Sequence, residues 1–583
     1  MVRKKAVVAL VLLAASSGPA LSQTHVRESL TTFLQDDEKI ASLLKGVAVM
    51  KSRDDAPKDS AEYRTSWEYW AAIHGYAGPE TRTIESFKEL LAQRAPDVAP
   101  FLSSFFTGLA DNTPPDALAE EVWATCQHGT DQFLAWHRMY LYFFERVLRA
   151  ASGDETFALP YWDYTNPGSP GDEPWRMPAL FVVSQLQGET GPVPNPLFEP
   201  RRTAGFGSTV ELDTAQTDID PILALDDFLD FQSTLDGTVH GYVHCATGNG
   251  CLAPRMGIVP FAGADPIFWH HHSNVDRIWS CWLDRHGADT LSPADSDWMK
   301  TTFAFVDETG ARVEMAVSEL FDPKGRIDYR YDAVDAAACF RDPPQVLVAA
   351  AGSRNAAGSG AGSAAAAEPA ASPRVLARDI RLVERSTVVP MAAAGAANPA
   401  AAGEARAVGP RRTVLRLNDV QAEGQPGATI AVELVSAADG RRARVGTIAF
   451  FALESHEGGH AHGGMSRSYA FELTGALGDL GVSSPTDVTV VLRAESFLPT
   501  VVAAGPATPP AAAAVDADAV AAALGDLDAE AFGRLRTEAE GAALDSVAAA
   551  GAPPPGTEAV TAADDLFRSA NITVREIVLD VRE

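Results

Sequence analysis

The sequence predicts a two-domain protein: a mainly α-helical domain over residues 23–345, a linker at 346–410, and a small antiparallel β domain over 411–583. Three observations predict this organisation. The length of 583 residues exceeds that of one compact domain, and the first part is rich in Trp, Phe and Tyr at helical spacing. After residue 411 the apolar period changes to two, which is the period of strands.

The first 22 residues, MVRKKAVVALVLLAASSGPALS, have a basic start, an apolar run too short to cross a bilayer, and a small-residue end. This pattern is typical of a secretory signal peptide, so we expect an exported chain, secreted or periplasmic. No other run is long and apolar enough for a membrane span. The formal charge of −30 argues against nucleic acid or an anionic membrane as a partner.

The helical domain holds most of the large aromatic residues. In SWEYWAAIHG, Trp67, Trp70 and His74 share one helical face, which predicts a packed core helix. Residues 349–373 and 391–410 are instead rich in Ala, Gly and Pro and lack the apolar residues that a core needs, which predicts linker. The run between them, VLARDIRLVERSTVV, is either a strand or a docking segment, and the sequence does not decide.

The β domain is predicted by runs such as TVLRLNDV, TIAVELV and DVTVVLRA, which alternate apolar and polar residues between turn residues. An Ala- and Pro-rich insertion at about 503–565 interrupts this pattern. It is followed by a strand-like run, NITVREIVLDV, and we expect that last strand to complete the domain across the insertion.

The run HGYVH places His240 and His244 at i and i+4, on the same side of a helix, where both can meet one metal ion. The spacing alone is a weak signal, because a histidine on an apolar helix is more often a core residue. A zinc protease needs Glu after the first histidine, and Gly241 stands there. A di-iron site needs paired Glu-x-x-His helices, and Glu457 to His460 lies in a glycine-rich run.

Two longer motifs resemble those of a known family. The stretch CQHGTDQFLAWHRMYLYFFE holds His128, His137 and Glu145, and DPIFWHHHSNVDRIW holds Phe268 and His272. They resemble the copper A and copper B signatures of tyrosinases and polyphenol oxidases at every fixed position and in the expected order. The runs LPYWDY and DYRYD resemble further motifs of the family. The resemblance covers roughly 320 residues well, and the β domain more loosely.

The resemblance implies a four-helix bundle that holds two copper ions in a dinuclear type 3 site. In the family the ligand is the histidine four before the aspartate, which selects His272 among three adjacent histidines. The resemblance implies that His271 supports the ligands without binding copper itself, and that His270 is not a ligand. Apart from His25, His74 is the only histidine upstream of the first motif, so it takes the third copper A position. Neutral imidazoles suit copper. The expected ligands are His74, His128 and His137 for copper A, and His240, His244 and His272 for copper B.

Five cysteines are an odd number for an exported chain, so one is expected to be free or modified. Cys126 stands two before His128, the arrangement that in fungal tyrosinases and molluscan haemocyanins carries a thioether between sulfur and imidazole. We expect that bond here; the alternative is a buried free thiol. The other four cysteines suffice for two disulfides. Cys245 and Cys251 are close in sequence, but sequence does not determine the pairing.

The resemblance also implies roles in handling the substrate. Phe268 lies one helical turn before His272, which fits the family's aromatic gate over copper B. Members with monophenol activity often have a Glu that holds a water, and Asn right after the first copper B histidine. Here Asp236 takes that Glu position, four before His240, and Gly241 replaces the Asn. The shorter carboxylate predicts weaker deprotonation of a phenol. The alternative for Asp236 is a residue at a helix N-terminus.

The implied activity is that of a polyphenol oxidase of the catechol oxidase or tyrosinase type. Such an enzyme oxidises o-diphenols, and in some members monophenols, to o-quinones with dioxygen. The expected partners are a phenolic small molecule and dioxygen, and the oligomeric state is not determined by sequence. Two alternatives stay open. One is a haemocyanin-like reversible dioxygen carrier, against which the signal peptide and the lack of repeats argue. The other is an o-aminophenol oxidase, which the same site would serve.

The β domain resembles the C-terminal domain that in long family members covers the active-site entrance and keeps the enzyme latent until it is cleaved or displaced. The linker is a suitable protease target. Within this domain, SHEGGHAHGG carries His456, His460 and His462. These histidines could capture copper, and the alternative is a solvated loop.

Overall fold

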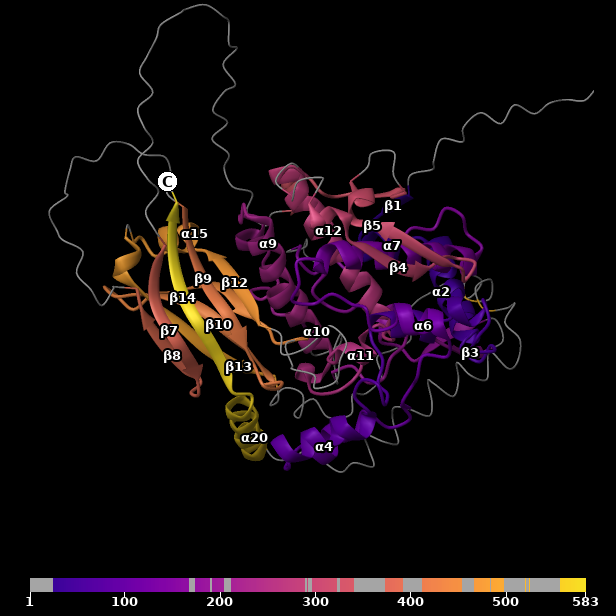
Figure 1. Cartoon of the computed structure of the whole chain (residues 1–583), viewed down its shortest axis with the longest axis horizontal. Helices are drawn as coiled ribbons and strands as arrows, with labels where there is room; N and C mark the ends of the chain where they lie inside the picture. The colour runs from indigo at the N-terminus through magenta and orange to yellow at the C-terminus, as the bar shows by residue number, and fades with distance from the viewer. Residues whose placement is uncertain are drawn as a thin grey trace, which may run out of the picture.

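We describe the chain from a computed structural model, shown in Figure 1, in which a helical domain lies beside a β-sandwich. This arrangement confirms the predicted fold class. The expected signal peptide, the loop with His456, His460 and His462, and most of the linker and insertion lie outside the described residues. The structure describes residues 25–166, 173–188, 191–203, 211–288, 291, 296–321, 326–339, 373–391, 412–452, 466–482, 484–497, 520, 524 and 556–582.

Three long helices form the centre of the first domain. They are α2 (Asp37–Ser52), α7 (Phe133–Ser152) and α12 (Pro266–His286), and α7 packs against both of the others. The start of α12 follows from its sequence, because the carboxylate of Asp265 accepts a hydrogen bond from the N–H of Ile267 and Pro266 occupies the first turn. The helix ends at Gly287, whose φ of +80° favours glycine.

A fourth helical segment runs beside them without a break in the chain. It consists of α9 (Phe228–Leu235), the π-helical turn η3 (Asp236–His240) and α10 (Gly241–Thr247). Such π turns inside helices occur often at functional sites, because the extra residue shifts the side chains that follow. The turn here holds the first histidine of the HGYVH motif.

The remaining elements of the helical domain are short. The parallel pair β1 and β6 joins the beginning of the domain to its end. The helices are α1 (Leu30–Phe33), α3 (Trp67–His74), α4 (Ile84–Arg94), α5 (Ala99–Ser104), α6 (Ala117–Val122), α8 (Asp220–Leu223), α11 (Val259–Ala262), α13 (Asp297–Lys300) and α14 (Ala336–Cys339). The strands are β1 (His25–Arg27), β2 (Gln185–Gly188), β3 (Gly191–Pro194), β4 (Thr302–Val306), β5 (Arg312–Ala316) and β6 (Tyr329–Tyr331).

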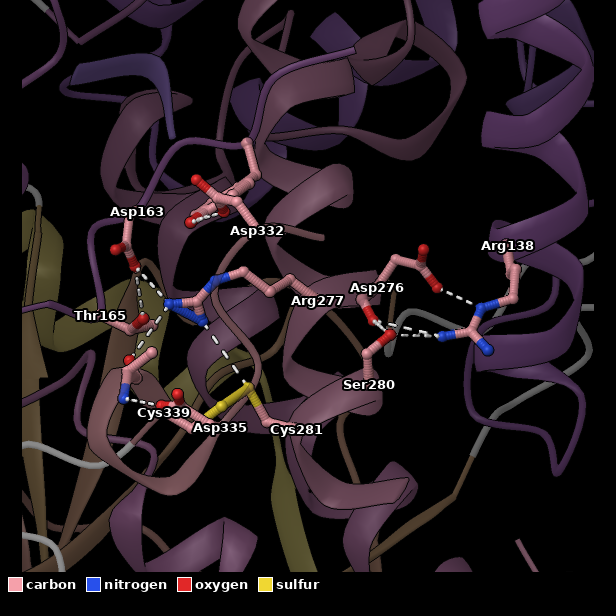
Figure 2. The surroundings of a disulfide bond; sticks show 12 residues. Arg138, Asp163, Thr165, Asp276, Arg277, Ser280, Cys281, Asp332, Asp335 and Cys339 are labelled. Carbon is pink, nitrogen blue, oxygen red and sulfur yellow. Dashed lines mark hydrogen bonds and ion pairs between the residues drawn. A yellow bond between two sulfur atoms is a disulfide. The ribbon is translucent and has the colours of Figure 1, made fainter. Parts of the chain in front are cut away.

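A buried network of charges connects β1, α7, α12 and β6. Arg27 donates to Glu145 (2.7 Å) and to the hydroxyl of Tyr331 (2.9 Å). Arg138 of α7 donates to Asp276 of α12 at 2.5 Å, as Figure 2 shows. Burial by itself would raise the pKa of Asp276, but Arg138 and Arg27 outweigh it and lower the pKa below its usual value. The network therefore holds together α7 and α12, the two helices that carry the two long histidine motifs.

Two disulfides form from four of the five cysteines. Cys245 pairs with Cys251, as their proximity suggested, and Cys281 of α12 pairs with Cys339 of α14. In Figure 2, Arg277 lies beside the second bridge and donates to Asp163 at 3.1 Å. This bridge attaches the last described helix of the first domain to the helix that holds the three adjacent histidines.

The second domain is a sandwich of two four-stranded antiparallel sheets. One sheet has the order β11-β10-β13-β8 and the other β12-β9-β14-β7. The segment that the sequence left undecided forms β7 and β8, so residues 374–390, within the range expected as linker, belong to the sandwich. The strands are β7 (Arg374–Leu382), β8 (Ser386–Pro390), β9 (Arg412–Gln421), β10 (Ala428–Ser436), β11 (Arg442–Ile448), β12 (Arg467–Glu472), β13 (Val488–Ser496) and β14 (Ile572–Arg582).

The final strand, β14, pairs with β9 and β7, so it completes the domain across the insertion as expected. Two helices accompany the sheets, α15 (Thr474–Asp479) and α20 (Gly556–Ser569). Leu566 of α20 packs with Phe87 of α4 in a cluster that both domains share, and α20 lies beside α4 in Figure 1. Among the described residues, no helix has the length and apolar character needed to cross a membrane.

The sandwich docks on the helical domain through β12. The N–H of Ala470 donates to the hydroxyl of Thr234 on α9 at 2.9 Å, and the N–H of Ala449 donates to the carbonyl of Gly237 at 2.7 Å. The edge strand β12 and the loop after β11 therefore lie directly against the segment that contains the π turn.

Candidate metal centre

Seven buried histidines and one buried cysteine gather between α3, α7, α10 and α12. They form two adjacent groups, and within each group the atoms that could ligate a metal lie within 4.8 Å of one another. A third group of the same kind, His128, Asp236 and His240, bridges the two. The first group is His74, Cys126, His128 and His137, and the second is His240, His244, His271 and His272.

Hydrogen bonds to the backbone fix the tautomer of four of these rings. Because a carbonyl oxygen only accepts, the Nδ1 that faces it carries the proton, and Nε2 keeps its lone pair for a metal. The four Nδ1–H groups donate as follows: His74 to Val259 (3.1 Å), His137 to Phe133 (2.8 Å), His240 to Asp236 (2.9 Å) and His244 to Met256 (2.8 Å).

The spacing of the Nε2 atoms fits a bound ion. The Nε2 atoms of His244 and His272 are 3.2 Å apart. Two nitrogens that bind one tetrahedral ion at about 2.0 Å lie about 3.3 Å from each other. Nε2 of His240 is buried and has no hydrogen-bond partner among the described residues. An all-imidazole set of this kind suits copper, zinc or nickel.

Three of the rings, those of His137, His244 and His272, have pKa values far below 7 and are neutral. Burial lowers the pKa of His137 to about 3, and it moves the pKa of His244 and of His272 well below the usual range. Neighbouring histidines lower these pKa values further, because two protonated rings would repel each other. The neutral imidazole is the form that binds a metal, so these three rings are ready to ligate at pH 7.

The three adjacent histidines of α12 have different surroundings. His272 lies in the second group and stacks on His137 of the first, with ring centroids 4.5 Å apart and an interplanar angle of 13°. His270 lies outside both groups; its Nδ1 donates to the carbonyl of Pro160 at 2.9 Å, and its ring contacts Phe181. His272 is therefore placed to ligate a metal with the second group, whereas His270 is not.

His271 lies within the second group but has a polar partner on its other side. Its Nδ1 is 2.8 Å from the hydroxyl of Tyr164, in the LPYWDY run. Burial raises the pKa of Tyr164, so the hydroxyl keeps its proton and can donate. With Tyr164 as donor, the neutral ring of His271 carries its proton on Nε2, and that nitrogen is then excluded as a ligand. No role for Tyr164 was predicted from sequence.

Cys126 is the cysteine without a disulfide among the five, and it is fully buried. Its Sγ lies 3.4 Å from Nδ1 and 3.7 Å from Nε2 of His128. Cε1 is the ring carbon between these two nitrogens, and the same sulfur lies 3.3 Å from Nε2 of His137. Burial raises the pKa of the thiol well above its usual value, and Asp236 adds to the shift.

Phe268 lies among the ligand rings. Its ring centroid is 4.2 Å from that of His272 and 4.8 Å from that of His74, so it contacts one ring of each group. It is fully buried. Phe268 lies one turn before His272 on α12, and its ring limits the space next to both groups.

Asp236 lies inside the continuous segment from α9 to α10, so the alternative that it begins a helix is wrong. Its Oδ2 accepts from the N–H of Gly129 at 2.7 Å, and its Oδ1 lies 3.2 Å from Nδ1 of His240. Burial would raise the pKa of this carboxyl, but Arg467 and a hydrogen bond from His240 outweigh that effect and lower the pKa.

The C-terminal domain contributes an aromatic ring that the sequence did not predict. Phe451, just after β11, stacks on His244 with a centroid distance of 3.7 Å and an interplanar angle of 5°. It also meets His128 edge-on at 5.4 Å. A Cβ on Gly241 would lie 3.1 Å from Cβ of Ala449 and 3.5 Å from Cβ of Phe451, so the glycine makes room for this loop.

Two family models match the chain. "Common central domain of tyrosinase" matches residues 64–202 and 189–285, and "Polyphenol oxidase middle domain" matches residues 293–343. A tyrosinase of Hahella sp. (strain CCB-MM4) is 28% identical over 309 residues, which are 49% of this chain and 59% of the relative. The latent form of a chloroplastic polyphenol oxidase of Prunus armeniaca is 29% identical over 252 residues, 37% of this chain and 40% of the relative.

The matched regions thus span about half the length of these curated relatives. A solved structure of a latent aurone synthase, described as a polyphenol oxidase, superposes with a TM-score of 0.50 at 17% identity, over 82% of this chain and 87% of that chain. This similarity concerns the fold and extends over both domains. Together with the two histidine groups, which lie within the matched range, the family models identify residues 64–343 as a domain of the family of tyrosinases and polyphenol oxidases.

Proposed function

We propose that the chain is a copper-dependent polyphenol oxidase that converts o-diphenols to o-quinones with dioxygen. The observation that carries the proposal is the pair of adjacent groups of buried imidazoles, in each of which the possible ligand atoms lie within 4.8 Å of one another. A dinuclear site needs two such groups side by side, one for each metal ion. The proposed ligands are His74, His128 and His137 for copper A, and His240, His244 and His272 for copper B.

Copper bound there would take up dioxygen and supply the oxidising power for the phenol. The protein's part is to orient and to exclude water. We assign the stacking surface for the phenol to the ring of His244, because Phe451 already occupies that face with ring-on-ring geometry. Phe268 confines the space beside His272, and the site is closed to water on the side that the C-terminal domain covers.

We assign proton transfer from the phenol to Asp236, whose carboxylate lies within reach of a histidine from each group. Aspartate is shorter by one methylene than the Glu expected at this position, so it holds a bridging water less closely. Gly241 adds no polar group beside it. A catechol loses its protons more readily than a monophenol, so we expect diphenol oxidation to exceed hydroxylation of monophenols.

We further propose that the uncut chain is latent. Phe451 lies where a substrate ring would stack on His244, and β12 and the loop after β11 cover that side. Family relatives described as latent support this reading. Removal of the C-terminal domain, by a cut in the linker, is then the activating event.

The signal peptide predicted at residues 1–22 and the two disulfides support export to an oxidising compartment.

We propose a thioether between Sγ of Cys126 and Cε1 of His128. The thiol hydrogen and the ring hydrogen are both lost, and dioxygen takes up the two hydrogen atoms as hydrogen peroxide. The peptide that carries both residues is expected to be two hydrogen atoms lighter in copper-loaded protein, as measured by mass spectrometry. Protein kept free of copper should retain the full mass, as should the Cys126→Ser variant relative to its own sequence. An unchanged mass in copper-loaded protein would contradict the bond.

The function is tested by measuring dioxygen uptake by copper-loaded protein with catechol and with tyrosine, before and after limited proteolysis within residues 346–372 of the linker. We expect little uptake before the cut, rapid uptake with catechol after it, and much slower uptake with tyrosine. Uptake with neither substrate after the cut, together with reversible binding of dioxygen, would favour a carrier. Faster uptake with o-aminophenol than with catechol would favour an o-aminophenol oxidase.

A further inference from the structure

The C-terminal domain places a buried cation beside the proposed copper site. Arg467 begins β12, its side chain is 1% exposed, and its Nη2 lies 2.8 Å from Oδ2 of Asp236, which is also 1% exposed. Among the described residues, Asp236 is the anion that pairs with this guanidinium. Burial of a guanidinium without a counter-ion is strongly unfavourable. The docked position of β12 therefore depends on the carboxylate of Asp236.

The backbone next to Asp236 is shaped to admit this side chain. A Cβ on Gly237 would lie 2.6 Å from Cδ of Arg467 and 2.4 Å from Cε1 of Tyr469, both closer than real contacts allow. The carbonyl of Gly237 accepts from the N–H of Ala449 at 2.7 Å. Glycine at this position thus lets two segments of the C-terminal domain approach the π turn.

The ion pair lies next to both histidine groups. The backbone carbonyl of Asp236 accepts from Nδ1 of His240, and its carboxylate belongs to the group that includes His128. Phe451 precedes residues 453–465 in the sequence and Arg467 follows them. Both side chains belong to the C-terminal domain, and they contact His244 and Asp236 respectively. Phe451 occupies the space of a substrate ring, whereas Arg467 engages a carboxylate.

We propose that the ion pair between Arg467 and Asp236 keeps the uncut chain latent. It fastens the C-terminal domain to the helical domain, and it holds the carboxylate of Asp236 away from the hydroxyl group of a phenol. This inference rests on the proposed oxidase function, because it names how that site is regulated. It predicts that loss of the cation activates the chain even while Phe451 is present.

A second ion pair between the domains provides a matched control. Arg416 of β9 pairs with Asp230 of α9, and it also donates to Asp580 within its own domain at 2.8 Å. Its side chain is 17% exposed, and Asp230 lies six residues before Asp236, outside the histidine groups. Arg416→Met therefore weakens docking of the C-terminal domain and leaves the proposed site unchanged. Arg467→Met weakens docking and also removes the cation that pairs with Asp236 at the site.

The test measures the initial rate of dioxygen uptake with catechol for copper-loaded wild type, Arg467→Met and Arg416→Met. Each is assayed as the uncut full chain and after a proteolytic cut within residues 340–372. We expect uncut Arg467→Met to be at least tenfold faster than uncut wild type, and uncut Arg416→Met less than threefold faster. After the cut all three should have the same rate, because both substitutions lie in the released domain.

The outcomes separate the two proposals. If cut wild type consumes no dioxygen, the proposed function fails and this inference falls with it. If cut wild type is active while uncut Arg467→Met stays as slow as uncut wild type, the function stands and the role of the ion pair is overturned. An equal rise in uncut Arg416→Met would also overturn it, since general loosening of the interface would then explain the activation.

Arg467→Met could raise the uncut rate simply because the C-terminal domain no longer folds, and Arg467→Lys tests this explanation. Lysine keeps the positive charge with a smaller head group, so its uncut rate should stay within threefold of wild type. A rate for Arg467→Lys as high as that of Arg467→Met would show that packing, and not charge, is responsible.

Discussion

The His272→Ala variant is expected to lose dioxygen uptake with catechol completely, even after removal of the C-terminal domain. His272 contributes one Nε2 to the second group, 3.2 Å from Nε2 of His244, and its ring stacks on His137 of the first. Alanine leaves one of the two proposed ions with two nitrogen ligands, and a copper ion held by two imidazoles binds weakly. Bound copper, measured by atomic absorption, should fall from two ions per chain to about one.

His270→Asn is the matched control, because it alters a buried histidine two positions away on the same helix. The asparagine amide can still donate towards the carbonyl of Pro160, which now accepts from Nδ1 of His270. We expect this variant to keep both coppers and most of its activity. The assignment of ligands on α12 would be wrong if His270→Asn lost copper while His272→Ala kept it.

The Phe451→Ala variant is expected to oxidise catechol without proteolysis, about a hundredfold faster than the uncut wild type. Truncation of a buried aromatic anchor in an interface costs about 2–4 kcal/mol, and about 2.7 kcal/mol corresponds to a factor of about one hundred in the docking equilibrium. The substitution also clears the face of His244 on which Phe451 now stacks. Initial rates of uncut and cut protein give the measurement, and the uncut rate should stay below the cut rate because the ion pair of Arg467 with Asp236 remains.

Phe497→Ala separates these two effects. Phe497 also lies at the interface, where it stacks on Tyr242 with a centroid distance of 6.1 Å, but it does not contact the histidine groups. Its loss should raise the uncut rate far less than the loss of Phe451. Equal rates for the two variants would mean that Phe451 acts by docking alone, and no rise for either would contradict the proposed latency.

Much of the metal centre could be predicted because its signals are local. The i, i+4 spacing in HGYVH and the two long motifs each lie within one helix or its approach, where sequence spacing translates directly into geometry. The change to period two likewise located the sandwich, since strand alternation is a local property. The cysteine pair at 245 and 251 was suggested by proximity alone, and the structure contains it.

The contacts made by the C-terminal domain could not be predicted in this way. Phe451 and Arg467 meet histidines and a carboxylate more than 200 positions earlier in the chain, and no local pattern marks which strand residue faces another domain. Phe450 illustrates the difficulty, because it packs in the core of the sandwich while its neighbour Phe451 packs in the helical domain. The π turn at Asp236 also has no periodic signature, so a helix start at this residue stayed open as an alternative.

Because of the strand order of the sandwich, a cut before β7 and a cut between β8 and β9 have different consequences. The first strand, β7, pairs with the last, β14, so a cut within residues 340–372 frees the whole sandwich as one piece. Re-association then becomes bimolecular and fades on dilution, whereas the intact tether maintains an effective concentration on the order of millimolar. A cut within residues 392–411 leaves β7 and β8 paired to β14 and β13, and the sandwich stays attached. Dilution therefore makes the first kind of cut irreversible and leaves the second without effect.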